Sequence, residues 1–232
     1  MGDLSGTVSL CIGGETLLLH PERAVLWPRA GAVIVADIHF GKSSSFGRHG
    51  LAVPAGSDQE DRARLTRLIE SFDSHRLIIL GDFFHEPLQP KSAESIDLES
   101  WSAALARTGV RIQVIAGNHD RGVQSGWRGS MEWIEGELRE PPFRFVHDSA
   151  RRNAVRQGAF TLSGHIHPVM ALRGLRKRVA RVPVFWQREQ GMELPSFGSF
   201  TGGYLISPAP GDRIYAVSPE GVVPFPATSN RR

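Results

Sequence analysis

The stretch Val-Ile-Val-Ala-Asp-Ile-His, residues 33–39, joins an apolar run to two side chains that can bind metal ions. The run is short and rich in Val and Ile, which predicts a strand over Ala32–Ala36 that is buried on both faces. Runs of the same character occur at Leu77–Leu80, Arg111–Ala116 and Ala159–Leu162. We therefore expect four buried strands, each ending close to a Gly or an Asp.

Two segments between the first three runs, Asp58–Phe72 and Ser92–Arg107, have the apolar period of a helix. The order strand, helix, strand, helix, strand predicts parallel strands joined by crossover helices. The apolar residues expected on the buried helix faces are Leu65, Leu68 and Ile69 in the first helix and Ile96, Leu98, Trp101 and Leu105 in the second.

Shorter apolar runs divided by Gly, Pro and Glu open and close the chain and predict hairpin strands on both sides of this core. These runs are Val8–Ile12, Thr16–Leu19, Ala24–Trp27, Arg178–Trp186, Tyr204–Ser207 and Arg213–Val217. Together the elements predict an α/β fold, a four-layer αββα sandwich of two mixed sheets flanked by helices. We expect a single domain over residues 1–232 with a flexible tail at 224–232.

The composition is that of a globular protein, with 41% hydrophobic and 22% charged residues, and it excludes a disordered or collagen-like chain. No stretch approaches the roughly 18 uninterrupted apolar residues of a membrane span, and no signal-peptide pattern opens the chain, so we expect a cytoplasmic protein. The sole cysteine, Cys11, lies in an apolar run and is expected in the core. A formal net charge of +3 permits contact with a polyanion but does not require it.

Candidate metal ligands follow all four buried strands. A single histidine after a strand is as readily a structural residue as a ligand. Four clusters at four strand ends favour ligands, because the carboxyl ends of strands in an open α/β sheet face one site. The clusters are Asp37-Ile-His39, Gly81-Asp82, Gly117-Asn118-His119-Asp120 and Gly164-His165-Ile-His167.

The donor atoms in these clusters are carboxylate and amide oxygens and imidazole nitrogens. Such a set suits manganese, iron or zinc, whereas calcium would prefer oxygen ligands alone. The set is also too large for one metal. It therefore predicts two divalent ions bridged by a carboxylate, roughly 3.5–4 Å apart.

Together the four clusters resemble the signature of the calcineurin-like metallophosphoesterase superfamily. That signature expects one more histidine between the block that contains His119 and the block that contains His165. His147 is the only histidine between these two residues. Residues 37–43, 53–54, 81–85 and 194–203 are further similar to one branch, the bacterial ligase-associated DNA damage response phosphoesterases, which are often described as endonucleases.

The resemblance implies roles for individual residues. A hydroxide held between the two metal ions would attack phosphorus in line, and His119 would protonate the leaving oxygen. Asp120 would either orient the His119 ring or serve as a local turn carboxylate. The implied ligands are Asp37, His39, Asp82 and His167 for one ion, and Asp82, Asn118, His147 and His165 for the other.

Weaker signals concern the substrate. Lys42 follows the first ligand pair closely enough to reach a phosphate, and His85 follows Asp82 closely enough to line the cleft, although both also fit ordinary surface or structural roles. The basic residues Arg173, Arg176, Lys177, Arg178 and Arg181, and Arg151, Arg152 and Arg156, would either follow a nucleic-acid backbone or form a solvated face.

The favoured function is a two-metal phosphodiesterase that cleaves phosphodiester bonds in nucleic acid, as a DNA repair endonuclease. The alternatives are an enzyme for nucleotides or other small phosphoesters, and a non-catalytic metal-binding scaffold in a repair complex. The expected metal is manganese, with iron or zinc as alternatives. The resemblance also implies a functional association with an ATP-dependent DNA ligase and a helicase.

Overall fold

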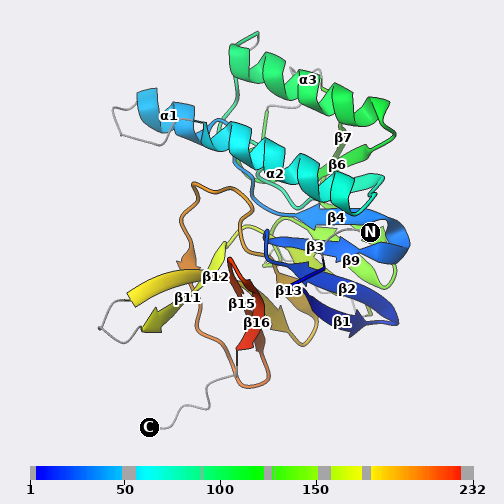
Figure 1. Cartoon of the computed structure of the whole chain (residues 1–232), viewed down its shortest axis with the longest axis vertical. Coiled ribbons are helices and arrows are strands. Elements are labelled where there is room, and N and C mark those ends of the chain that lie inside the picture. The colour runs from blue at the N-terminus through cyan, green and yellow to red at the C-terminus, as the bar shows by residue number, and fades with distance from the viewer. Residues whose placement is uncertain are drawn as a thin grey trace.

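The computed structural model describes residues 4–48, 56–89, 91–122, 127, 129–150, 158–173 and 179–225, and its strands form two sheets (Figure 1). The strands of the first sheet are β1 Val8–Ile12, β2 Glu15–His20, β3 Ala24–Trp27, β4 Ala32–Val35, β5 Arg76–Ile79, β6 Arg111–Ile115 and β7 Glu132–Ile134. They lie side by side in chain order. The first four strands pair antiparallel, whereas β4 to β7 pair parallel.

The second sheet is built from the other nine strands. They are β8 Glu137–Glu140, β9 Phe143–Val146, β10 Phe160–Ser163, β11 Pro168–Arg173, β12 Val179–Arg188, β13 Gly191–Glu193, β14 Tyr204–Leu205, β15 Arg213–Ser218 and β16 Gly221–Phe225. Strand β10 lies between β9 and β13 and is parallel to both. This sheet is therefore mixed as well, as predicted.

The helices are α1 Lys42–Arg48, α2 Ser57–Ser71 and α3 Ala93–Arg107, with a 3-10 turn at Pro28–Ala30. Figure 1 shows α2 and α3 covering the outer face of the first sheet. Within the described residues no helix of similar length lies on the outer face of the second sheet. No helix in this part of the chain is long and apolar enough to cross a membrane.

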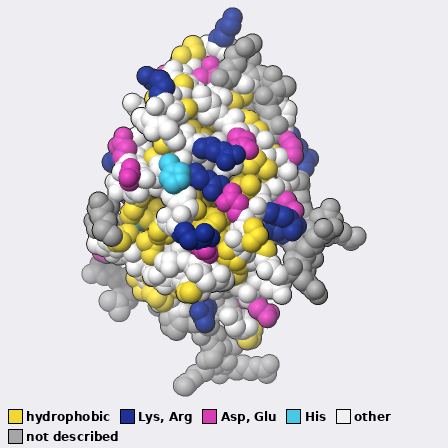
Figure 2. Space-filling model, turned by 90° about the vertical axis from the view of Figure 1, so that its right-hand side faces the viewer, with side chains coloured by type: hydrophobic (Ala, Val, Ile, Leu, Met, Phe, Trp, Pro, Cys, Tyr) yellow, Lys and Arg dark blue, Asp and Glu magenta, His cyan; other side chains and the backbone are white. Residues whose placement is uncertain are grey.

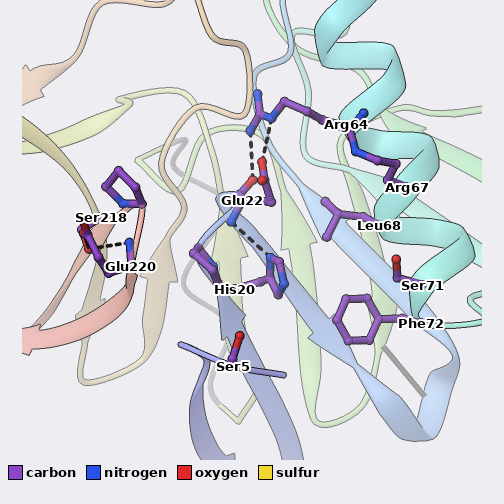
Figure 3. A pocket seen from close by; sticks show the side chains of 12 residues that line it. Ser5, His20, Glu22, Arg64, Arg67, Leu68, Ser71, Phe72, Ser218 and Glu220 are labelled. Carbon is purple, nitrogen blue, oxygen red and sulfur yellow. Dashed lines mark hydrogen bonds and ion pairs between the residues drawn. The ribbon is translucent and has the colours of Figure 1, made fainter. Parts of the chain in front are cut away.

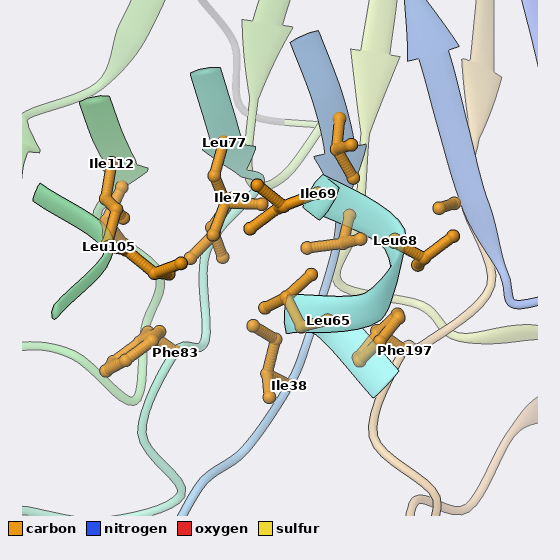
Figure 4. Packing of buried hydrophobic residues seen from close by; sticks show 14 of the residues in the cluster. Ile38, Leu65, Leu68, Ile69, Leu77, Ile79, Phe83, Leu105, Ile112 and Phe197 are labelled. Carbon is orange, nitrogen blue, oxygen red and sulfur yellow. The ribbon is translucent and has the colours of Figure 1, made fainter. Parts of the chain in front are cut away.

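Two cores hold these layers together because side chains alternate between the faces of a strand. In β4, Val33 and Val35 pack under the helices, whereas Ile34 faces the second sheet. Figure 4 shows Leu65, Leu68 and Ile69 of α2 in the first of these cores, together with residues of β5 and β6. The second core, between the sheets, includes Phe143, Phe145 and Leu162 of the second sheet.

The predicted α/β sandwich of two mixed sheets is confirmed, although in the described residues the long helices cover only the first sheet, and three further details differ. Cys11 is exposed because side chains alternate along the edge strand β1 and its neighbours Leu10 and Ile12 take the inner face. Ile96 is 51% exposed, because it lies about 200° around the helix from the buried Leu98. Pro224 and Phe225 belong to β16, so the expected tail begins too early; residues 226–232 lie outside the described ones.

Candidate metal centre

The loops that follow β4, β5, β6, β9 and β10 meet where the carboxyl ends of the parallel strands of the two sheets face each other. The backbone N–H of His165, after β10, donates to both carboxylate oxygens of Asp37, after β4, at 3.1 and 2.9 Å. The backbone N–H of His119 donates to Oδ1 of Asp82 at 2.9 Å. These bonds hold two buried carboxylates in place, and those from His165 to Asp37 also tie the second sheet to the first.

One group of donor atoms comes from Asp37, His39 and His167. The Nε2 atoms of the two histidines are 3.3 Å apart, and Nε2 of His167 is 3.6 Å from Oδ2 of Asp37. The three donor atoms all lie within 4.8 Å of one another. Such a convergence of two imidazole nitrogens on a buried carboxylate is the arrangement that a divalent metal ion requires.

A second group comes from Asp82, Asn118, His147 and His165. Nε2 of His147 is 3.5 Å from Oδ2 of Asp82 and 2.9 Å from Oδ1 of Asn118. Nδ1 of His165 is 3.1 Å from the same Nε2. Oδ2 of Asp82 also lies 3.9 Å from Nε2 of His39, so this carboxylate stands between the two groups.

Backbone carbonyls orient two of the candidate ligand rings. Nδ1 of His147 lies 3.0 Å from the carbonyl oxygen of Leu80, and Nδ1 of His167 lies 3.1 Å from that of Gly202. A proton on each Nδ1 would complete these hydrogen bonds and leave Nε2 free to accept a metal. Holding the far ring nitrogen in this way is how proteins set the tautomer and direction of metal-binding histidines.

The backbone around the centre is strained in a consistent way. Five candidate ligands have φ in the left-handed region, where non-glycine residues are uncommon. Their φ values are 52° for Asp37, 57° for His39, 47° for Asp82, 77° for His165 and 48° for His167. Strain of this kind persists where the surrounding structure holds a functional geometry, and it clusters at functional sites.

The glycines that precede the ligands leave room for other ligands. A Cβ at Gly81 would be closer than 3.0 Å to the ring of His147, and one at Gly117 would be equally close to Oδ1 of Asp82. A Cβ at Gly164 would be 2.7 Å from Oδ2 of Asp37. Each glycine therefore makes space for a donor that arrives from a different strand, and the residues present fit a metal centre.

Burial favours neutral imidazoles at this centre. Desolvation, with smaller contributions from neighbouring cations, lowers the pKa of His39 to about 2 and the pKa of His85 to about 4. Burial also acts to lower the pKa of His167, but its contact with the charged Asp37 outweighs this and raises the pKa. Neutral rings are the form in which histidine binds metal.

His85 and His119 lie beside the first donor group. Their rings are stacked 5.4 Å apart with an interplanar angle of 21°, and both pack edge-on against His39. Nδ1 of His119 is 2.7 Å from the backbone carbonyl of His85. That carbonyl therefore orients the His119 ring and leaves its Nε2 without a role in this contact. A ring nitrogen of each of His39, His85 and His119 lies within 4.8 Å of those of the other two, so these histidines form a third group that could hold a metal ion.

Asp120 accepts hydrogen bonds from backbone N–H groups and does not orient the His119 ring, which was one of the two interpretations of its role. Its carboxylate is fully buried and accepts the backbone N–H groups of Phe83, Phe84 and Gly117 at 3.3, 3.0 and 2.9 Å. Burial raises the pKa of this carboxyl, and these bonds oppose the rise. Asp120 is thus the turn carboxylate of the alternative interpretation, joining the loop after β5 to the loop after β6.

The other predicted substrate residues are placed only in part. Lys42 begins α1, and its ammonium lies 5.7 Å from the centre of the Phe46 ring. Burial lowers the pKa of Lys42, while the charge of Asp82 acts in the opposite direction. Arg181 is exposed on β12. The side chains of the remaining basic candidates, at 151, 152, 156, 173 and 176–178, lie outside the described ones.

Sequence reasoning missed Phe46 and Phe200, whose rings pack together beside His85. Phe46 lies in the short helix α1, which no apolar period revealed. Phe200 lies in the segment 194–203, whose similarity to one branch of the superfamily was noted without a role. That similarity was the only available signal.

A separate pocket of about 360 Å³ lies between β2, α2 and the β15–β16 turn (Figure 3). Two of its lining carboxylates accept hydrogen bonds within the pocket: Nε of Arg64 donates to Glu22 at 2.7 Å, and the hydroxyl of Ser218 donates to Glu220 at 2.8 Å. None of the candidate metal ligands lines it. This pocket is therefore separate from the metal centre.

Comparisons with known proteins found one family and several solved structures that are similar to this chain. A family model described as calcineurin-like phosphoesterase matches residues 32–189, more than half of the chain. The chain is similar to the Pseudomonas putida nuclease MPE, with 32% identity over 94% of this chain and 100% of that one and a TM-score of 0.77. A structure of Yfce, a phosphoesterase from E. coli, is 16% identical over 81% of this chain and 88% of that one, with a TM-score of 0.40. No curated protein matches the sequence.

Proposed function

The chain belongs to the calcineurin-like phosphoesterase family and is a metal-dependent phosphoesterase, and we propose that it is a two-metal phosphodiesterase that cleaves nucleic acid. The observation that carries the proposal is the pair of donor groups joined by Asp82, in a chain that resembles a nuclease over nearly its whole length. One donor group alone would suffice for a single ion. Two adjacent groups with a shared carboxylate favour a pair of ions.

Asp37, His39, Asp82 and His167 would hold one ion, and Asp82, Asn118, His147 and His165 would hold the other. Manganese fits this mixture of oxygen and nitrogen donors, as iron and zinc also do. Bound divalent ions would supply Lewis acidity, lowering the pKa of the attacking water and offsetting charge on the phosphoryl oxygens. The residues contribute a rigid, partly buried frame, since the strained backbone and the hydrogen bonds to Asp37 and Asp82 leave the donors little freedom.

His119 would act on the leaving oxygen. Its Nδ1 is held by the carbonyl of His85, so a protonated ring would give up the proton at Nε2. His85, stacked on His119, would keep the ring from rotating. Asp120 would take part only by fixing the turn that carries His119.

A nucleic-acid substrate is favoured by the similarity to a nuclease at 32% identity. On the one face shown in Figure 2, the described basic and acidic side chains are interspersed, with no continuous basic stripe. A place in DNA repair beside an ATP-dependent DNA ligase and a helicase is part of the same proposal. It is supported by the sequence similarity of residues 194–203 and the other motifs of that branch.

The test is hydrolysis by protein stripped with a chelator and reloaded with Mn²⁺, assayed on a labelled oligonucleotide, on bis-p-nitrophenyl phosphate and on p-nitrophenyl phosphate. We expect metal-dependent cleavage of the oligonucleotide and the diester, with two ions bound per chain. Hydrolysis of the diester without cleavage of any oligonucleotide would indicate an enzyme for small phosphoesters. No turnover on any substrate, with metal bound, would indicate a scaffold and contradict the proposal.

A further inference from the structure

A pocket of about 330 Å³ opens beside the metal centre and is lined by Lys42, Phe46, Ser199, Phe200, Thr201 and Gly202. Two contacts place it there. The carbonyl of Gly202 lies 3.1 Å from Nδ1 of the candidate ligand His167, and the Phe46 ring is 5.6 Å from the ring of His85. A substrate bound at the metals could therefore extend directly into this pocket.

Two aromatic rings form the apolar part of the pocket. Phe46 and Phe200 are 5.7 Å apart in an edge-to-face arrangement, and both are only partly buried. Neither ring belongs to any of the three hydrophobic cores of the described structure. Their packing therefore does little for the fold, and a paired aromatic surface next to a reactive centre calls for another explanation.

The loop that carries Phe200 is anchored by hydrogen bonds to α2 and to the loop after β4. The hydroxyl of Ser196 donates to the carbonyl of Asp37 at 2.7 Å, and the backbone N–H of Ser199 donates to the buried Asp61 of α2 at 2.8 Å. Arg64 of α2 donates to the carbonyl of Phe197 at 3.3 Å; Figure 3 shows the same side chain also bound to Glu22. Such anchoring pre-organises the Phe200 ring, which lowers the entropic cost of binding a partner.

We propose that Phe46 and Phe200 form a base-stacking subsite, so that the nucleobase next to the scissile phosphate packs against these rings and the Lys42 ammonium faces its phosphate. This inference rests on the proposed function and deepens it by naming the preferred substrate, an unpaired strand. A base inside a duplex is already stacked on both faces and is not available to the rings. The bases of single-stranded segments and frayed ends are free to stack on these rings.

The chemistry of the pocket fits a nucleobase. Aromatic side chains bind unpaired bases by stacking on their flat faces, and cationic groups beside them neutralise the phosphates. A volume near 330 Å³ lies at the lower end of the roughly 300–1,000 Å³ that ligand pockets span, which suits one ring system and not a duplex. Lys42, 5.7 Å from the centre of the Phe46 ring, supplies the cation.

The experiment combines a protein change with a substrate change. Phe200→Leu is assayed on a single-stranded oligonucleotide with one defined cleavage site, and on the same strand with an abasic residue next to the scissile phosphate. We expect Phe200→Leu to lower kcat/KM on the intact strand by roughly 5- to 100-fold, the range that stacking of one base implies. On the abasic strand the variant and the parent protein should cleave equally well, because the interaction is already absent.

Two controls separate stacking from a general loss of structure. Phe160→Leu makes the same chemical change at a partly buried ring. Phe160 begins β10, at the end of the strand away from His165, and its substitution should leave the ratio of intact to abasic cleavage unchanged. Phe200→Trp should retain preference for the intact strand. An equal loss by Phe200→Leu on both strands would overturn the subsite, as would equal cleavage of single-stranded and blunt duplex substrates by the parent protein. Failure of the parent protein to cleave any nucleic acid would instead overturn the proposed function.

Discussion

Gly117 touches the carboxylate of Asp82 so closely that a Cβ at position 117 would be nearer than 3.0 Å to Oδ1 and to the backbone nitrogen of residue 82. We expect Gly117→Ala to displace Asp82 and to lower kcat on a diester by about 10²-fold, the cost of a displacement near 1 Å at a reacting centre. Metal content, measured by mass spectrometry after gel filtration, should fall with it.

Gly47→Ala is the matched control for this substitution. Neither Gly47 nor Gly117 has a positive φ, so alanine is compatible with both backbones, but a Cβ at position 47 meets no atom within 4 Å. Activity and metal content should stay at the parent level. Full metal binding in Gly117→Ala would mean that Asp82 is not confined as its surroundings imply.

Asp82 itself provides the sharpest test of the two-ion arrangement. It is 2% exposed and lies 3.9 Å from His39 and 3.5 Å from His147, one from each donor group. Asp82→Asn keeps the shape and removes the charge that both ions would share, so diester hydrolysis should fall to background and metal content should drop below two ions per chain. Retained activity with two bound ions would contradict the shared role.

Much of the fold was predictable because the apolar pattern of this chain is strong where the core is. The run 32–36 alternates between two cores, so burial on both faces leaves little choice but a central strand. Cys11 shows the limit of this pattern. One face of the edge strand β1 is exposed to solvent, and nothing in the sequence says which side chains lie on that face. The helix α1 carries Lys, three Ser and Gly with a single Phe, so it offers no apolar period to recognise.

Six of the ligand-type side chains were predictable from their position after strands, and His147 from the resemblance to the superfamily signature; the structure brings all seven together. The groups that orient their imidazole rings were not predictable. The carbonyls of Leu80, Gly202 and His85 orient imidazoles from distant parts of the chain, and a backbone oxygen leaves no mark in the sequence. Asp120 was ambiguous for the same reason, since its partners are backbone N–H groups.

The loop that carries Phe200 should depend on Asp61. Both oxygens of this buried carboxylate accept hydrogen bonds, from Ser199 and from Arg64. We expect Asp61→Asn to lower the free energy of unfolding by about 1–3 kcal/mol, because an amide leaves one buried donor unmatched. Chemical denaturation would measure it. Asp97→Asn is the control: Asp97 pairs with Arg62 at 3.5 Å but its side chain is 62% exposed, so its loss should be within about 1 kcal/mol.

The metal-free protein should lose stability as the pH falls. Burial lowers the pKa of His85 to about 4, whereas an unfolded histidine keeps a value near 6.5. Between these values the unfolded chain binds a proton that the folded chain excludes, so the stability that His85 contributes above pH 6.5 declines down to about pH 4. Melting temperatures in chelator at pH 7.0, 5.5 and 4.5 would show it. In His85→Gln the decline should be shallower, and an unchanged slope would assign the effect to other groups.

His119 lies beside the metal centre and outside the two donor groups around Asp82, with Nδ1 held by the carbonyl of His85 at 2.7 Å. We expect His119→Ala to retain both metal ions and the parent melting temperature within a few degrees. Its kcat on an oligonucleotide should fall by about 10²–10⁴-fold, the usual contribution of general acid–base catalysis.

The size of that loss should depend on the leaving group. An alkoxide needs a proton as it departs, whereas p-nitrophenolate needs little help, so His119→Ala should lose far less activity on bis-p-nitrophenyl phosphate than on an oligonucleotide. An equal loss on both substrates would mean that His119 acts on the phosphoryl oxygens and not on the leaving oxygen. Loss of one metal ion from the variant would show that His119 is a ligand, because a ring nitrogen of His119 lies within 4.8 Å of nitrogens of His39 and His85.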